Sequence, residues 1–343
     1  MPIRPLLAAL ALAAVTQPAG AADVIEVAFD APTPLAERAL LAERLLHGYQ
    51  ATRVLALAGA RGISLAGPAL DPRRERWRVY APDACHDGPC GVLVWIDPSR
   101  DATLPRDWLR VLDAHQMIFV GAHDSGNERD LVDRRVPLAL FGLAGIEARH
   151  ALDQRRYVAG FSGGGRAASR AAAAFPEAFA GGLYVATADG PGTVDVPLPG
   201  GDGLARLRAQ RNYLVVGDLD PVNFQILRDA ERAYRRACAL DVELAVVRNW
   251  SHRRPDGRTL DRALDWLERG PRAAPAAHQA CSREAESAAR AALAPVHTAL
   301  ARGDRAAAKR ALLAAHVAWG GMVAAEFARL LPEVEEPEGA AAR

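Results

Sequence analysis

Short apolar runs alternate with amphipathic segments between residues 76 and 270. The runs are rich in β-branched and aromatic residues and predict seven strands, at 77–80, 91–96, 117–121, 157–161, 183–186, 213–216 and 242–247. Helical spacing of apolar positions predicts helices at 107–114, 138–152, 164–174, 224–237 and 260–267. Because alternating strands and helices form parallel sheets covered on both faces, we predict an α/β fold with a mostly parallel central sheet.

Two stretches lie outside this alternation. Residues 189–203 are rich in Gly and Pro, and we expect a surface loop there that could form a lid or pocket wall. After Pro275 the chain becomes alanine-rich, and apolar spacing predicts a helical hairpin, 284–302 and 305–319. The pattern divides the chain into an N-terminal segment (22–75), a main domain (76–272) and a C-terminal helical extension (273–343).

The first residues are typical of an export signal. Arg4 supplies a positive charge, Leu6–Val15 is almost wholly apolar, and Ala19-Gly20-Ala21 fits a small-x-small cleavage site. We therefore predict a signal peptide at 1–21 and a periplasmic or extracellular protein; the alternative is a retained N-terminal helix. The apolar stretch is too short to span a bilayer, and no later segment reaches that length.

Charge excludes one class of partner. The chain of 343 residues has 42 basic and 41 acidic residues, and its formal net charge is +1. Arginines are spread beside acids, without the basic stripe that nucleic-acid binding proteins show. We expect no nucleic-acid partner.

Four cysteines remain after the predicted signal peptide, an even number that suits an oxidising compartment. Cys85 and Cys90 flank a tight His-Asp-Gly-Pro turn and are the favoured pair, which leaves Cys238 for Cys281. The other pairings stay open. A zinc site at Cys85, His86 and Cys90 lacks a fourth ligand, so we expect no metal.

The segment Gly160-Phe161-Ser162-Gly163-Gly164 lies between a predicted strand and a predicted helix. A nucleophilic serine is presented on such a sharp turn, where glycines avoid clashes that any Cβ would create. The same region, Gly163–Ala168, also fits a dinucleotide-binding Gly-x-Gly-x-x-Ala pattern. A strand-terminal acid about twenty residues on is missing, so we expect Ser162 to be a nucleophile and no cofactor to bind.

A general base and an acid follow in the order that a hydrolase requires. His252 comes after the last predicted strand, and Asp218 and Asp220 come after the strand before it. We favour Asp220 as the acid because it lies deeper in its loop and precedes Pro221, which helps to fix the turn. Asp218 is the alternative.

On these residues the region from about 76 to 270 resembles the α/β-hydrolase superfamily, and within it the polyhydroxybutyrate depolymerase/feruloyl esterase-like group of secreted esterases. The resemblance is carried by Gly160–Arg166, Gly217-Asp218-Leu219-Asp220 and His252 followed by Ala263–Leu267. It implies cleavage of carboxylic esters through an acyl-enzyme, without a metal or organic cofactor. The Gly-x-x-Asp of the group implies Asp220 as the acid.

One departure concerns the oxyanion hole. The group carries His-Gly after the third strand, where this chain has Ile96-Asp97-Pro98-Ser99. Pro98 has no N–H, so we expect the backbone N–H groups of Gly163 and of Ser99 or a neighbour to be the two donors. Polar Asn127 and Arg129 are interpreted as solvated surface residues.

Two other functions stay open. The Asp97-Pro98-Ser99 turn and the helical tail would suit a non-catalytic binding protein built on a hydrolase scaffold. The same fold also supports amide hydrolysis, so a peptidase is the other alternative. Nothing in the sequence identifies the acyl or alcohol part of a substrate.

Overall fold

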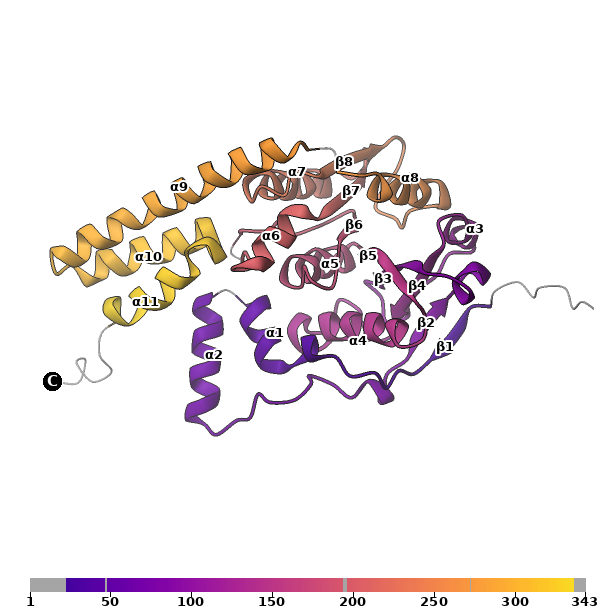
Figure 1. Cartoon of the computed structure of the whole chain (residues 1–343), viewed down its shortest axis with the longest axis horizontal. Coiled ribbons are helices and arrows are strands. Elements are labelled where there is room, and N and C mark those ends of the chain that lie inside the picture. The colour runs from indigo at the N-terminus through magenta and orange to yellow at the C-terminus, as the bar shows by residue number, and fades with distance from the viewer. Residues whose placement is uncertain (1–22, 47, 194–195, 272, 336–343) are drawn as a thin grey trace, which may run out of the picture.

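The computed structural model contains one eight-stranded sheet with helices on both faces (Figure 1). It describes residues 23–46, 48–193, 196–271 and 273–335, so the predicted signal peptide at 1–21 lies outside the described residues. The strands are β1 (Ile25–Val27), β2 (Trp77–Tyr80), β3 (Cys90–Ile96), β4 (Met117–Ala122), β5 (Leu152–Phe161), β6 (Gly181–Val185), β7 (Arg211–Gly217) and β8 (Val242–Val247).

Eleven α-helices accompany these strands in the described part of the chain. They are α1 (Arg38–Leu45), α2 (Gly48–Ala60), α3 (Arg106–Ala114), α4 (Val136–Glu147), α5 (Gly163–Ala174), α6 (Asp202–Ala209), α7 (Pro221–Arg236), α8 (Gly257–Glu268), α9 (Pro275–Ala301), α10 (Arg305–Trp319) and α11 (Ala324–Val334). Short helical turns lie at Pro34–Ala36, Pro72–Arg74, Asp83–His86 and Gly320–Val323, and a π-helical turn at Leu131–Arg135 leads into α4.

The strand order is β1-β2-β4-β3-β5-β6-β7-β8. The pairs β1–β2 and β2–β4 are antiparallel, and the remaining pairs are parallel. This order, with a serine turn after β5, is the α/β-hydrolase fold. The predicted fold class is therefore confirmed.

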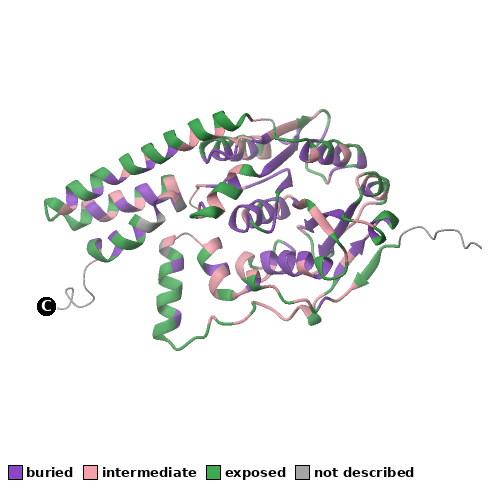
Figure 2. Cartoon of the chain, in the orientation of Figure 1, coloured by how far each residue is buried: buried purple, intermediate pink, exposed green. Residues whose placement is uncertain are grey.

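Two apolar layers hold the helices to the sheet. One face of the sheet packs against α3 and α8, with Trp95, Trp108 and Leu264 fully buried between them. The other face packs against α1 and α4–α7, through residues such as Phe141 and Tyr234. Figure 2 shows the resulting pattern, in which the strands and α4 and α5 are largely buried while α2 is mostly exposed.

Several boundaries differ from the sequence prediction. The predicted helix 138–152 ends at Glu147, because residues 152–156 pair with β3 and become the first half of β5. Part of the predicted loop 189–203 and the residues after it form α6. The N-terminal segment supplies β1, which pairs with β2. The sheet therefore contains residues from both sides of the predicted boundary at residue 76. Only three residues long, β1 is too short to predict from periodicity.

The C-terminal extension contains the predicted hairpin and one further helix. Asp304 caps α10 by accepting a hydrogen bond from the backbone N–H of Ala307, and Gly303 adopts the left-handed conformation that the turn requires. α11 then folds back, and Val296, Leu312 and Phe327 lie in one buried apolar cluster. Within the described part of the chain, every helix is too short or too polar to cross a membrane.

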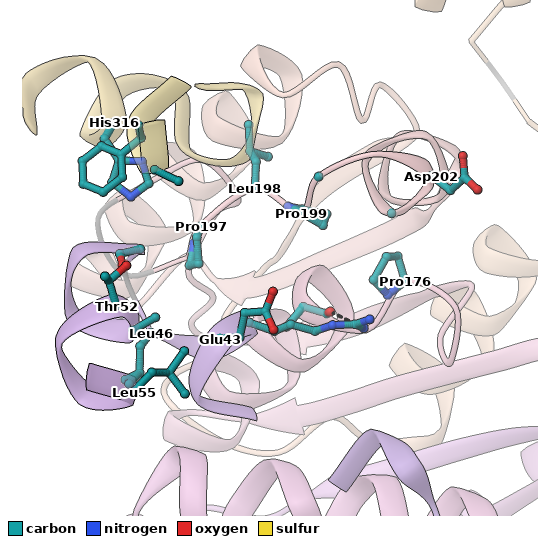
Figure 3. A pocket seen from close by; sticks show the side chains of 18 of the residues that line it. Glu43, Leu46, Thr52, Leu55, Pro176, Pro197, Leu198, Pro199, Asp202 and His316 are labelled. Atoms are coloured by element: carbon teal, nitrogen blue, oxygen red, sulfur yellow. Dashed lines mark hydrogen bonds between the residues drawn. The ribbon is translucent and has the colours of Figure 1, made fainter. Parts of the chain in front are cut away.

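The N-terminal and C-terminal helices meet around a cavity of about 730 Å³ (Figure 3). Leu46 lines it from the end of α1, Thr52 and Leu55 from α2, Pro197 from the loop before α6, and His316 from α10. His316 is buried and stacks on Phe327, with ring centroids 4.1 Å apart. This cavity thus lies where the extension contacts the main domain.

Both disulfides occur in the predicted pairing. Cys85–Cys90 joins a helical turn to the start of β3, and Cys238–Cys281 joins the end of α7 to α9. The two cysteines of the disfavoured zinc alternative are therefore bonded to each other. The second bond attaches the C-terminal helices covalently to the helix that follows β7.

His115 at the end of α3 joins α3 to α8 and should make folding pH-dependent. Its Nδ1 lies 2.9 Å from Glu268 and its Nε2 3.1 Å from Asp261. The hydrogen bond to Glu268, partly opposed by burial and aided by Asp261, raises the pKa of His115. A raised pKa means that the charged form is stabilised in the folded state. This stabilisation is complete below the unfolded pKa of about 6.5 and is lost as pH rises through the folded pKa.

We therefore expect His115→Gln to lower the free energy of unfolding by about 1 kcal/mol at pH 5.5, and by less at pH 9. Urea unfolding of both proteins at the two pH values measures the difference. An equal loss at both pH values would contradict the ionic contribution and would indicate lost packing alone.

Candidate active site

Ser162 lies in the turn between β5 and α5, in a backbone conformation that residues with a Cβ rarely adopt (φ +54°, ψ −129°). Neighbouring segments come too close for side chains here. A Cβ on Gly160 would lie 2.3 Å from the carbonyl carbon of Gly164, and one on Gly164 would lie 2.0 Å from the carbonyl oxygen of Ile96. The glycines therefore permit the turn, and the turn presents the Ser162 hydroxyl at the carboxyl edge of the sheet.

Three predicted site residues come together in a chain of hydrogen bonds. His252 Nε2 lies 2.9 Å from Ser162 Oγ, and His252 Nδ1 lies 2.8 Å from Asp220 Oδ2. Asp220 is buried, whereas 43% of the His252 side chain is exposed. They come from the ends of β5, β7 and β8, which lie at one edge because these strands are parallel. The arrangement allows proton transfer from Ser162 to His252.

Asn223 in the first turn of α7 fixes the acid. Its Nδ2 lies 2.8 Å from each carboxylate oxygen of Asp220. Burial alone would favour the neutral carboxyl, but the hydrogen bonds from His252 and Asn223 outweigh it and hold the pKa of Asp220 below its usual value. Asp220 is thus an ionised partner for the imidazole. The sequence analysis missed Asn223; its only signal is a position one helical turn after the acid.

Asp218, the alternative acid, has another contact. Its Oδ1 accepts a hydrogen bond of 3.3 Å from the backbone N–H of Trp250, in the loop that leads to His252. Trp250 is buried, and its carbonyl oxygen lies so close to Gly217 that a Cβ there would be 1.7 Å away. Asp218 therefore connects the two loops, while Asp220 contacts the histidine.

Ser99 does not lie as the sequence analysis expected. Its backbone N–H donates to Asp97 Oδ1 at 2.9 Å, and its hydroxyl donates to the same oxygen at 2.5 Å. Ser99 also is not among the residues that line the cavity at Ser162. The prediction of Ser99 as an oxyanion donor is therefore corrected: the buried Asp97 carboxylate already uses its amide. The sequence offered no sign that Asp97 would turn inward.

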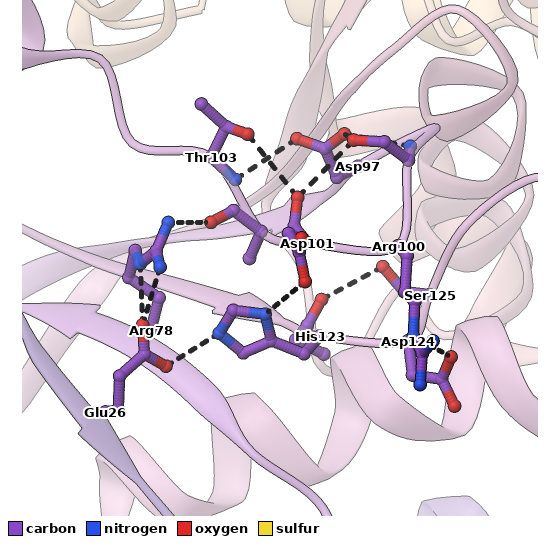
Figure 4. Close-up of polar contacts among 12 residues, drawn as sticks. Glu26, Arg78, Asp97, Arg100, Asp101, Thr103, His123, Asp124 and Ser125 are labelled. Atoms are coloured by element: carbon purple, nitrogen blue, oxygen red, sulfur yellow. Dashed lines mark hydrogen bonds and ion pairs between the residues drawn. The ribbon is translucent and has the colours of Figure 1, made fainter.

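Asp97 is fully buried and organises the loop after β3. Its Oδ2 accepts hydrogen bonds from Trp95 Nε1 (3.1 Å) and from the backbone N–H of Thr103 (3.3 Å), the latter drawn in Figure 4. Arg254, two residues after His252, pairs with its Oδ1 at 2.6 Å. The ion pair therefore joins the loop of the histidine to the loop after β3.

The same close-up shows where another post-strand histidine lies. His123, which follows β4, has its Nε2 2.6 Å from Glu26 and its Nδ1 3.5 Å from Asp101 (Figure 4). Glu26 also pairs with Arg78. These contacts hold β1 against the sheet and involve none of Ser162, Asp220 and His252.

Arg135, at the end of the π-helical turn, is buried and connects three loops. Its guanidinium donates to the backbone carbonyls of Ser125 (2.7 Å), Gly163 (3.2 Å) and Asp97 (3.3 Å). Burial lowers the pKa of Arg135 from its ordinary value, but a guanidinium stays charged in proteins. The cation thus holds the serine turn, the loop after β3 and the loop after β4 in one arrangement.

Asn127 lies directly beside the serine turn. A Cβ added to Gly163 would be 2.1 Å from Asn127 Oδ1 and 2.9 Å from Nδ2, so the amide occupies the space that a side chain at 163 would need. The backbone N–H of Asn127 donates to the Pro98 carbonyl at 2.9 Å, which positions the loop. The sequence analysis interpreted Asn127 as solvated. Asn127 is exposed, in agreement with that interpretation, and its side chain also contacts the serine turn at Gly163.

These elements surround a cavity of about 420 Å³ at Ser162. The described residues that line it are Asn127, Leu131, Arg135, Ser162, Gly163, Arg166, Ala167, Arg170, Thr187 and Asn223. Gly163–Ala168, the candidate dinucleotide motif, forms the serine turn and the first turn of α5. Among the described residues, no group of three or more His, Cys, Asp and Glu side chains is arranged to hold a metal ion.

No family model and no curated protein matches the sequence. Solved structures similar to the chain include a thermostable esterase, with 14% identity and a TM-score of 0.40, over 56% of this chain and 56% of its own. S-formylglutathione hydrolase FrmB from Staphylococcus aureus has 13% identity and a TM-score of 0.44, over 59% of this chain and 95% of its own.

Dipeptidyl peptidase 4 from Porphyromonas gingivalis has 14% identity and a TM-score of 0.43, over 56% of this chain and 33% of its own. The chain therefore spans about half the length of the thermostable esterase and a third of the peptidase. The similar structures thus comprise esterases and peptidases. The fold is assigned from the strand order, and the function is argued below from the residues of the site.

Arg254→Met tests the ion pair with Asp97. The substitution leaves a buried carboxylate without its cation, and we expect the free energy of unfolding to fall by about 2–4 kcal/mol. Asp97→Asn in the same chain removes the orphaned charge and should recover about half of that loss. Urea unfolding of the single and double variants measures both effects. A single variant as stable as the parent would show that Arg254 does not compensate Asp97.

Proposed function

We propose that the chain is an exported serine hydrolase that cleaves carboxylic esters through an acyl-enzyme intermediate. Ser162 is the nucleophile, His252 the general base and Asp220 the acid that orients it. The observation that carries this proposal is the unbroken hydrogen-bonded chain from Asp220 through His252 to Ser162, with distances of 2.8 and 2.9 Å. The strained turn at Ser162 supports it, because strain of this kind is maintained at functional sites.

In the first step, His252 Nε2 takes the proton of the Ser162 hydroxyl as its oxygen attacks the ester carbonyl. Asp220 accepts a hydrogen bond from Nδ1–H, selects that tautomer and stabilises the imidazolium that forms. His252 then gives the proton to the leaving alcohol. Water attacks the acyl-enzyme in the second step, with His252 again as the base, and the carboxylic acid is released.

The negative charge of the tetrahedral intermediate requires donors that are in place beforehand. The backbone N–H of Gly163 is the first donor, because the first N–H groups of a helix have no partner within it and the helix dipole favours an anion there. We assign the second donor to the side-chain amide of Asn127 in place of Ser99. Its contact with Gly163 supports this assignment, since the two residues lie next to each other and both line the cavity at Ser162.

Export is part of the proposal. The two disulfides are suited to an oxidising compartment, and the predicted signal peptide would direct the chain there. Secretion of the full-length chain, and loss of secretion without residues 1–21, is the direct test.

Ser162→Ala should abolish ester turnover. Without the oxygen nucleophile, the rate on short p-nitrophenyl esters should fall at least about 10³-fold, and a fluorophosphonate probe should no longer label the protein. Spectrophotometric assays with a graded acyl series measure turnover and give the first account of the pocket. Absence of both turnover and labelling in the parent would favour a binding protein. Faster cleavage of peptide p-nitroanilides than of esters would favour a peptidase.

Asn127→Leu should lower kcat about 10²–10³-fold with little change in KM, because the lost hydrogen bond forms only in the transition state. Glu128→Gln, at the next position and 56% exposed, is the matched control and should leave kcat within about twofold, as a surface substitution does. Steady-state kinetics on one ester measures both. Unchanged kcat in Asn127→Leu would contradict the assignment of Asn127 and would favour a backbone N–H as the second donor.

A further inference from the structure

The cavity at Ser162 is strongly basic. Three of its ten described lining residues are arginines, Arg135, Arg166 and Arg170, and none of the ten is acidic. A neutral ester does not require this lining, since an ordinary ligand pocket is mostly apolar. The proposed mechanism uses none of the three guanidinium groups on the reacting atoms. Arg135 joins three loops, but Arg166 and Arg170 call for another explanation.

Helix geometry places two of these cations beside the nucleophile. Arg166 and Arg170 follow Ser162 at intervals of four residues, so they lie on the face of α5 that begins at the serine turn. Arg135 reaches the same cavity from the π-helical turn. Like charges converging from two elements repel each other, and this arrangement is unfavourable unless negative charge is supplied.

One carboxylate of the chain contacts two of these cations. Asp189, after β6, lies with Oδ2 2.5 Å from Arg170 Nε and with Oδ1 3.3 Å from Arg166 Nε. One carboxylate thus serves two guanidinium groups, while Arg135 donates to neutral carbonyls. Arg166 is the most accessible of the three, with 47% of its side chain exposed, against 20% for Arg170. Arg166 therefore presents an accessible guanidinium at the cavity.

A buried polar atom gives a second, independent indication of a ligand. Thr187 lines the same cavity and is 5% exposed, and its hydroxyl has no hydrogen-bond partner among the described residues. Buried hydroxyl groups are nearly always paired in native proteins. A ligand oxygen in the cavity would provide the missing partner.

We propose that this cavity binds a carboxylate carried by the ester substrate, with Arg166 as its principal ligand. The proposal rests on the proposed serine hydrolase function and names its substrate class: esters with a carboxylate a few bonds from the scissile carbonyl. A guanidinium binds a carboxylate through two parallel hydrogen bonds, so Arg166 fixes the direction of the substrate as well as its charge. Asn127 and Gly163 then receive the carbonyl oxygen.

Matched ester pairs test the preference. One p-nitrophenyl ester has an acyl chain that ends in a carboxylate, and its partner ends in the methyl ester of that carboxylate. A second pair carries the same difference on the leaving group. Comparison of the two pairs shows whether the arginines bind a carboxylate on the acyl side or on the leaving-group side of the ester bond. We expect kcat/KM to be at least about tenfold higher for the charged member of one pair, and the ratio to fall with added salt.

Arg166→Gln should remove this preference. It should lower kcat/KM for the charged ester about tenfold or more and leave the neutral partner within about twofold. Arg166→Lys keeps the charge and should retain part of the preference. Arg232→Gln, an exposed position on α7 that pairs with Asp229, is the matched control and should change neither ester. Equal preference in the parent and in Arg166→Gln, or no preference in either pair, would overturn the proposal.

A binding experiment separates this proposal from the proposed function. Calorimetric titration of monomethyl glutarate into Ser162→Ala needs no turnover, and we expect binding that Arg166→Gln in the same chain weakens about tenfold or more. Binding of this kind without labelling by a fluorophosphonate would overturn the hydrolase and retain the carboxylate site. Turnover of neutral esters with no binding of monomethyl glutarate would overturn the carboxylate site and retain the hydrolase.

Discussion

Close contact between backbone segments at the Ser162 turn is the constraint on which the rest of the site depends. Gly160, Gly164 and Gly165 approach carbonyl groups of the chain at distances that leave no room for a side chain. These contacts bring the start of α5 against the ends of β3 and β6. The helix N-terminus, the nucleophile and the neighbouring loops are therefore placed by contacts within the backbone, which change little when surface residues change.

Around this turn, charged side chains occupy buried positions of the kind that apolar side chains fill elsewhere in the core. Asp97 and Arg135 are both buried, and each contacts several backbone groups of the loops that surround Ser162. Removing an ion from water is unfavourable, and only several well-placed partners offset it. Because so many partners must be in place together, the loops have few alternative arrangements. The same contacts therefore both stabilise the fold and position the loops of the site.

Sequence reasoning reached the fold and the order of the site residues because both follow from local signals. Apolar runs mark parallel strands, and parallel strands bring Ser162, Asp220 and His252 to one edge whatever the loops do. The contacts of Ser99, Asn127 and Asn223 depend on how loops far apart in sequence pack. Asp97 illustrates the difference: its carboxylate turns inward because Trp95, Thr103 and Arg254 are there to receive it. The hydrophobic periodicity of the sequence gives no indication of these contacts.

The disulfide bond joins Cys238 to Cys281, which are 43 positions apart in the sequence. The loop that it closes contains β8, His252 and α8. Closing a loop of that length restricts the unfolded chain and, in the chain-entropy model, favours folding by about 4 kcal/mol. His252 therefore lies inside the segment whose conformational freedom the bond reduces. Formation of the bond therefore assists the placement of His252: a reduced chain reaches this position without the constraint, whereas an oxidised chain samples a much smaller set of conformations.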